Sequence, residues 1–124
     1  MIFPTLEQYA RAKGAATRVP RVILPYHRKM YAAITSWAAG TLPGGARNLA
    51  ITIPPRHGKT LAAHDTVEWL FGMVPESRWL YTAYSADLAV SQTMRIRDAL
   101  VSDWYRLMFP DTQVRGNRQN FVTT

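Results

Sequence analysis

A glycine, a lysine and a threonine stand in a row at Gly58, Lys59 and Thr60, the residue types with which nucleotide-binding loops hold phosphate. In such a loop the glycine lets the backbone approach the phosphates, the lysine bridges the terminal phosphates, and the threonine hydroxyl binds Mg²⁺. The usual pattern has another glycine five residues before Gly58, and here that position is Ile53. Because the tripeptide often arises by chance, the elements on either side of it decide the interpretation.

The segment before the motif has the composition of a buried strand, and the segment after it has the spacing of a helix. Residues 48–53 form a short apolar run that ends at two prolines. After the motif, apolar residues recur at helical spacing until Gly72 and Pro75 close the pattern. A phosphate-binding loop requires a strand before it and a helix after it, because free N–H groups and the dipole at a helix start attract anions. Lys59 is unfavourable at a helix start unless it has an anion to bind.

Two residues inside the loop carry further expectations. Arg56 can stabilise charge on a transferring phosphoryl group, bind phosphate passively or pair with a carboxylate. His57 is expected to shape the loop, because hydrolysis in such sites normally uses a carboxylate or a glutamine to orient water. The expected nucleotide contacts in the loop are Pro55, Arg56, His57, Gly58, Lys59 and Thr60, with Lys59 and Arg56 in catalytic roles and Thr60 as the Mg²⁺ ligand. The histidines lack metal-ligand spacing, so no transition-metal site is expected.

The remaining elements suggest an α/β protein. Helices are predicted over residues 6–13, 26–39 and 86–108, a second buried strand over residues 79–84, and another strand within residues 120–124. Alternating strands and helices predict a parallel sheet with flanking helices. Two or three parallel strands do not make a stable sheet by themselves. We therefore expect this chain to be the first part of a larger domain. Residues 1–40 would be a helical lead-in, and residues 47–124 the core.

The composition is that of a folded protein with an excess of positive charge. The 124 residues are 48% apolar and carry a net charge of +7, from twelve Arg and three Lys against eight carboxylates. The planar donors of Arg match phosphate oxygens, which favours nucleotide or nucleic acid, although solubility or an acidic partner would also explain the charge. Arg97 lies in an apolar helix stripe and either snorkels, pairs with a carboxylate or reaches a phosphate. With no cysteine and no apolar run of about 20 residues, we expect a soluble cytoplasmic protein.

The sequence Pro-Pro-Arg-His-Gly-Lys-Thr at residues 54–60 resembles the divergent Walker A motif of the large terminase subunits of tailed bacteriophages. Residues 24–28 resemble the segment that contacts adenine in this family, which implies that Tyr26 and His27 contact the nucleotide. The family often carries Gln in that segment, where this chain has His27 nearby. Residues 84–110 are similar to the strand and helix that follow in the family, so the resemblance covers about residues 22–124. It implies the RecA-like fold of P-loop NTPases.

The resemblance implies the ATP-binding part of a DNA-packaging motor that uses ATP and Mg²⁺ in the host-cell cytoplasm. Its partners would be double-stranded DNA, a portal protein, a small terminase subunit and copies of itself in a ring, while no DNA-binding residue is assigned. No two of the eight acidic residues are adjacent, so the Walker B element is missing, as is the family's nuclease domain. We therefore expect the chain alone to be inactive. The alternatives are a truncated, non-catalytic fragment that binds phosphate or DNA, and another P-loop enzyme such as a small-molecule kinase.

Overall fold

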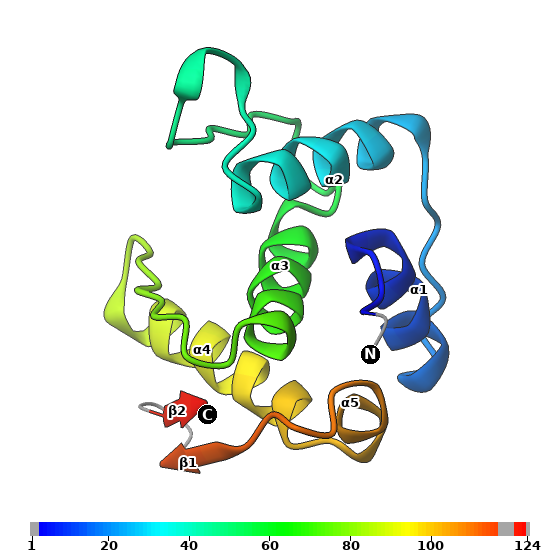
Figure 1. Ribbon diagram of the computed structural model, residues 1–124, viewed down its shortest axis with the longest axis vertical. Helices are drawn as coiled ribbons and strands as arrows, with labels where there is room; N and C mark the ends of the chain where they lie inside the picture. The colour runs from blue at the N-terminus through cyan, green and yellow to red at the C-terminus, as the bar shows by residue number, and fades with distance from the viewer. Residues whose placement is uncertain (1–2, 117–120, 124) are drawn as a thin grey trace. The chain divides into compact units, whose positions relative to one another are not determined.

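The structure is a computed structural model of the chain, and it describes residues 3–116 and 121–123 (Figure 1). In chain order the elements are α1 (Leu6–Ala16), α2 (Pro25–Ala38), the 3-10 turn η1 (Pro43–Gly45), α3 (Lys59–Met73), α4 (Ala86–Leu100), α5 (Asp103–Met108), β1 (Val114–Gly116) and β2 (Phe121–Thr123). The chain divides into two compact units, Met1–Thr66 (unit 1) and Val67–Thr124 (unit 2), with the boundary inside α3. In the part of the chain that the structure describes, no helix has the length and apolar character needed to cross a membrane.

The predicted parallel α/β sheet, and with it the RecA-like fold, is wrong. Residues 48–53 and 79–84, the two expected strands, have no strand pairing. Across residues 3–116 and 121–123, strand pairing is confined to a short antiparallel ladder in which Val114 of β1 lies opposite Thr123 of β2. A strand forms when its backbone groups and one face find partners, and local composition does not supply them. Leu80 is 89% exposed and Ile51 is 37% exposed, so neither apolar run is buried as a central strand would be.

The first two helices of unit 1 agree with the sequence prediction. At the start of α1, the Thr5 hydroxyl accepts the Gln8 N–H at 3.2 Å, while the Gln8 side chain accepts the Thr5 N–H at 2.8 Å. This reciprocal cap fixes the start of the helix. The helix runs to Ala16, three residues beyond its predicted end, and α2 begins and ends one residue before its prediction. Figure 1 shows these two helices as the first two coils of the chain.

A buried ion pair ties the first half of α3 into unit 1. Arg21 donates two hydrogen bonds to the Asp65 carboxylate, at 2.8 and 3.1 Å, and the Lys13 ammonium lies 3.4 Å from the same group. The Asp65 side chain is fully buried, and those of Arg21 and Lys13 are 11% and 14% exposed. Burial, and next the Asp65 charge, raise the pKa of the Tyr31 hydroxyl. The buried apolar residues of unit 1 are Leu6, Tyr9, Ala10, Met30, Tyr31, Ile34 and Ala62.

The prediction of a single helix over residues 86–108 in unit 2 is wrong, because the helix is interrupted at Ser102. The backbone of Ser102 is extended, with ψ 153°, and its hydroxyl donates to the Ala99 carbonyl at 2.5 Å. Ser102 thus ends one helix and precedes the next, as its preference for helix caps allows. Arg97 donates to the Gly116 carbonyl of β1 at 3.1 Å, so its guanidinium is engaged within unit 2.

The core of unit 2 gathers around the ring of Phe109. A Cβ atom on Gly72 would lie 2.5 Å from the Phe109 ring, which explains a glycine inside α3, one residue before the helix ends at Met73. The Tyr105 hydroxyl donates to the Glu68 carbonyl at 2.6 Å, and burial raises the pKa of this tyrosine strongly. Residues 121–123 form β2, as predicted for a last strand, while residues 120 and 124 lie outside the described residues. The apolar core comprises Trp69, Phe71, Ile96, Leu100, Tyr105 and Phe109.

Candidate phosphate-binding site

The predicted loop leads directly into the N-terminus of α3. Residues 55–58 form a turn and a bend, and the helix begins at Lys59. The Gly58 carbonyl accepts the Ala62 N–H at 2.9 Å, so the helical hydrogen bonding begins at the motif glycine. The helix after the loop is therefore confirmed, whereas the strand before it is not. The first N–H groups of a helix have no intrahelical acceptors, and here they follow the loop immediately.

Two residues of the loop have left-handed backbone conformations. Gly58 has φ 86°, a value that glycine adopts without steric cost. Arg56 has φ 63°, which is uncommon for a residue with a side chain and is often found where backbone geometry serves a function. A Cβ atom on Gly58 would also lie 3.4 Å from Nε2 of His27. Backbone conformation and a close neighbour thus both favour glycine at position 58.

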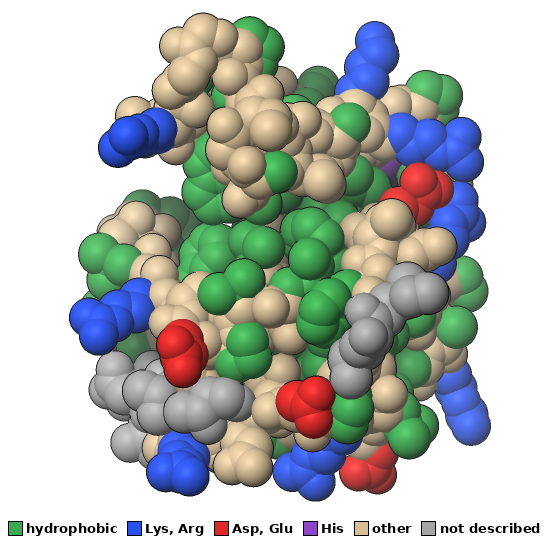
Figure 2. Space-filling view, in the orientation of Figure 1, with side chains coloured by type: hydrophobic (Ala, Val, Ile, Leu, Met, Phe, Trp, Pro, Cys, Tyr) green, Lys and Arg blue, Asp and Glu red, His purple; other side chains and the backbone are tan. Residues whose placement is uncertain are grey.

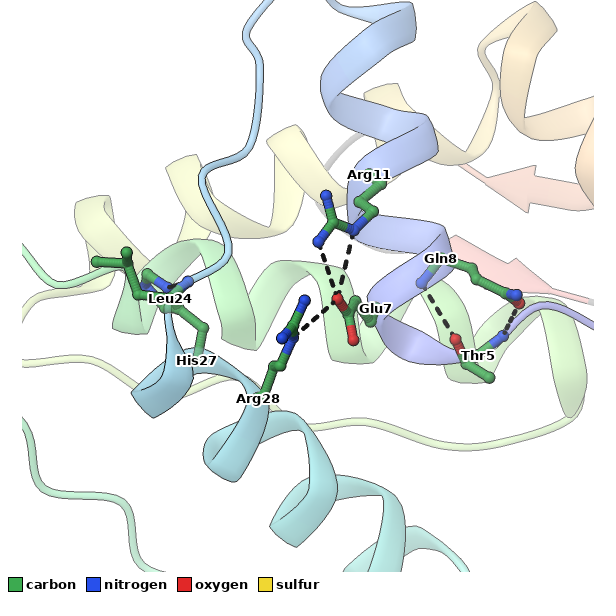
Figure 3. Close-up of polar contacts among 7 residues, drawn as sticks. All are labelled: Thr5, Glu7, Gln8, Arg11, Leu24, His27 and Arg28. Atoms are coloured by element: carbon green, nitrogen blue, oxygen red, sulfur yellow. Dashed lines mark hydrogen bonds and ion pairs between the residues drawn. The ribbon is translucent and has the colours of Figure 1, made fainter.

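His27 connects the start of α2 to this loop. Its Nδ1 accepts the Leu24 N–H at 3.0 Å, and its Nε2 lies 3.1 Å from the His57 carbonyl oxygen (Figure 3 labels the pair Leu24 and His27). Because Nδ1 is an acceptor, the hydrogen of the neutral ring is on Nε2. His27 therefore donates to the His57 carbonyl and holds it against the first turn of α2.

Three aromatic rings lie together beside the loop. The Tyr26 ring is 4.1 Å from the His27 ring and 5.6 Å from the His57 ring, measured between ring centres. His57 Nδ1 lies 2.8 Å from the Pro55 carbonyl, and since a carbonyl only accepts, this nitrogen carries a hydrogen and donates it. The expectation that His57 shapes the loop is consistent with this bond, which ties its ring to the loop backbone two residues away.

The predicted ligand-contacting residues fall into two groups. The structure brings Tyr26, His27, His57 and Gly58 together. The remaining loop residues expose their side chains to solvent, where a ligand can reach them: Pro55, Arg56, Lys59 and Thr60.

Sequence reasoning missed the contact between His27 and the loop. The available signal was the position of His27, third in a helix that begins at Pro25, because side chains at that position often bond back to the residue before the helix.

Both carboxylates of unit 1 pair with cations that lie outside the loop. Glu7 accepts hydrogen bonds from Arg11 at 3.0 Å and from Arg28 at 3.4 Å (Figure 3), and Asp65 is in the buried pair with Arg21. Within the described residues, His, Asp and Glu side chains form no group of three or more that could hold a metal ion. In the loop, the side-chain oxygen of Thr60 suits Mg²⁺, but a carboxylate is lacking. The residues present would hold Mg²⁺ only together with phosphate oxygens of a ligand.

The net charge of the chain resides in unit 1. Residues 1–66 hold nine Lys and Arg and two carboxylates, which gives 9 − 2 = +7, whereas residues 67–124 hold six of each, which gives 6 − 6 = 0. On the face drawn in Figure 2, Lys and Arg side chains project at several separate points of the surface. The unit that contains the loop is thus the one whose charge attracts anions.

Comparisons of the chain with protein-family models, with curated proteins and with solved structures found no match.

Proposed function

We propose that residues 54–60 bind the phosphate groups of a nucleotide, and that this nucleotide is ATP with Mg²⁺. In this proposal Lys59 contacts the terminal phosphates, Arg56 adds a second cation, and the Thr60 hydroxyl completes the oxygen ligands of the metal. One observation carries the proposal: a left-handed glycine directly precedes the first turn of a 15-residue helix, with exposed cations beside it. The N–H groups of that turn, the helix dipole and the two side-chain charges all favour a bound anion.

The wider role that we propose is the nucleotide-binding part of a DNA-packaging ATPase of the large-terminase type. The resemblance of residues 54–60 and 24–28 to that family supports it. Such a motor works in the host-cell cytoplasm on double-stranded DNA, together with a portal protein, a small terminase subunit and further copies of itself. Because no two of the eight acidic residues are adjacent, as the carboxylates of a Walker B element would be, we expect the 124-residue chain alone to bind ATP weakly and to hydrolyse it negligibly.

A second function, binding of nucleic-acid backbone without hydrolysis, is favoured by the charge distribution. The net +7 of unit 1 is accompanied by only two carboxylates, Glu7 and Asp65, and both already contact arginines. Cations that are not neutralised within the protein can replace the counterions of DNA phosphates, which drives binding of any sequence.

Calorimetric titration of the full chain with ATP and Mg²⁺ tests the first function, with Lys59→Ala as the test variant and Lys29→Ala as the control. Lys29 is an exposed lysine of α2 in the same unit, so both variants lower the charge of that unit equally. Loss of a charge-assisted hydrogen bond predicts binding weakened about tenfold or more by Lys59→Ala. Loss of an exposed, screened charge predicts a change of about twofold or less for Lys29→Ala. Equal affinities of the two variants, or no binding by the unmodified chain, would refute the assignment.

Fluorescence anisotropy with two duplexes of unrelated sequence tests the second function. Backbone binding predicts equal affinities for both duplexes and a steep fall with salt, with a log–log slope of about −0.9 for each phosphate contacted. Binding of DNA by a chain that does not bind ATP would favour this function over the first. Failure to bind DNA at low salt would exclude it for this chain.

A further inference from the structure

The ring of His27 has both nitrogens engaged within unit 1. Nδ1 accepts the Leu24 N–H at 3.0 Å, and Nε2 donates to the His57 carbonyl at 3.1 Å. A neutral histidine has one donor and one acceptor, so this ring has no hydrogen-bonding capacity left for the edge of a nucleotide base. A direct contact between His27 and a base would therefore require one of these two bonds to break.

We propose that His27 is a positioning residue that sets the orientation of the His57–Gly58 peptide in the phosphate-binding loop. This inference rests on the proposed phosphate binding at residues 54–60, and it assigns to His27 a role through the loop in place of contact with the ligand.

The geometry of the peptide bond explains how one hydrogen bond achieves this. A trans peptide is planar, and its C=O and N–H point in opposite directions. Since the His57 carbonyl points to His27, the N–H of Gly58 points away from α2. A peptide rotated by half a turn would direct a carbonyl oxygen, which repels anions, to the side where the N–H now lies. The bond from His27 therefore favours the orientation in which the loop offers a donor.

The conformation of Gly58 is a second reason to infer that His27 sets the orientation of the His57–Gly58 peptide. Its φ of 86° belongs to a region in which glycine moves with little steric restraint, so the peptide needs an external contact to hold one orientation. The His27 ring supplies that contact, because Nε2 and Cδ2 lie 3.4 and 3.9 Å from the position of a Cβ atom on Gly58. In this structure the ring both bonds the carbonyl before Gly58 and limits the space beside it.

Two substitutions separate this role from helix capping. In His27→Gln the side-chain amide nitrogen stands as many bonds from Cβ as Nε2 does, so this nitrogen can still donate to the His57 carbonyl. The amide oxygen of the glutamine can at the same time accept the Leu24 N–H, as in a capping box. In His27→Asn the amide oxygen stands as many bonds from Cβ as Nδ1 does, so the cap is kept and the bond to the loop is lost. Thermal unfolding of both variants checks that the cap and the fold are retained.

The affinities for inorganic tripolyphosphate and for ATP, measured by calorimetry on the full chain, test the proposal. Positioning predicts that His27→Asn weakens both ligands by the same factor, about tenfold, and that His27→Gln stays within about twofold of the unmodified chain. Weakening of ATP alone would mean that His27 contacts the base, and unchanged affinities in His27→Asn would mean that it only caps α2; either result overturns the inference.

The unmodified chain distinguishes failure of this inference from failure of the proposed function. If it binds neither tripolyphosphate nor ATP, phosphate binding at the loop is refuted and the positioning role falls with it. If it binds both and His27→Asn binds equally well, the loop binds phosphate without the help of His27, and the proposed function stands.

Discussion

Removal of the Asp65 carboxylate is expected to destabilise unit 1 more than removal of any exposed charge. Arg21 contacts this carboxylate through two hydrogen bonds, at 2.8 and 3.1 Å, and the side chains are 11% and 0% exposed. At this separation two unit charges attract by about 6 kcal/mol with an effective dielectric constant of about 20. Much of that attraction offsets the cost of taking both charges out of water. Asp65→Ala leaves the Arg21 charge buried, with its desolvation cost, but removes the attraction that offsets this cost. We therefore expect the free energy of unfolding to fall by about 3–5 kcal/mol.

Denaturation with urea, followed by circular dichroism, measures this loss, and Glu7→Ala is its matched control. Glu7 also contacts two cations, Arg11 and Arg28, at 3.0 and 3.4 Å, but those side chains are 50% and 61% exposed. Exposed ion pairs contribute little, because water and salt screen them and the side chains lose entropy when they pair. We therefore expect a far smaller effect from the control, and one that salt weakens further.

A comparison of the two variants decides whether burial is the cause. If Asp65→Ala unfolds at the same urea concentration as Glu7→Ala, the buried pair contributes no more than an exposed one and the reasoning is refuted. If Asp65→Ala is too unstable to purify, Asp65→Asn provides the measurement, since it keeps an acceptor for Arg21 and removes only the charge. A melting temperature for Asp65→Asn within about 4 °C of the unmodified chain, which corresponds to about 1 kcal/mol, would contradict the expectation.

Two further predictions concern single contacts. Gly72→Ala improves helix propensity by about 1 kcal/mol, but it places a methyl group 2.5 Å from the Phe109 ring, and overpacking costs about 1–3 kcal/mol. We expect net destabilisation by urea denaturation, reduced in a Phe109→Leu background; stabilisation by Gly72→Ala would contradict the packing. Hydrogen bonding to Arg11, and next to Arg28, lowers the pKa of Glu7 below its usual 4.5. A carboxylate whose pKa is lowered by folding stabilises the folded state above pH 4.5, and this stabilisation is lost as the pH falls through the lowered pKa. Glu7→Gln should therefore be less stable than the unmodified chain at pH 7 and equally stable in stronger acid. A stability difference independent of pH would argue against this.

Local rules were sufficient for the features whose partners lie close in sequence. The cap of α1 joins residues three positions apart, Thr5 and Gln8, so the sequence predicts the start of the helix. The same holds for the start of α3 directly after Gly58, because the loop motif and the helical spacing of apolar residues adjoin each other. These predictions depend on backbone hydrogen bonds made within a few residues.

Prediction failed where the outcome depended on partners far away in the chain. Residues 48–53 and 79–84 have the composition of buried strands, but a strand exists only if another segment pairs with it, and composition does not show whether one does. Leu80 is 89% exposed in spite of its apolar surroundings in the sequence. The expected α/β sheet was therefore an inference about long-range pairing drawn from local signals.

The candidate site divides in the same way. The sequence by itself determined that Gly58 and Lys59 stand where a loop meets the start of a helix, and this residue pattern is the basis of the proposed phosphate site. Only the tertiary structure decided that His27 donates to the His57 carbonyl, 30 residues away, and that Asp65 pairs with Arg21, 44 residues away. Unit 1 has nine cations for two carboxylates, so charge alone does not select a partner. Folding selects the partner of the buried carboxylate. The cost of burying that charge is offset only by a cation that packing brings within hydrogen-bonding distance.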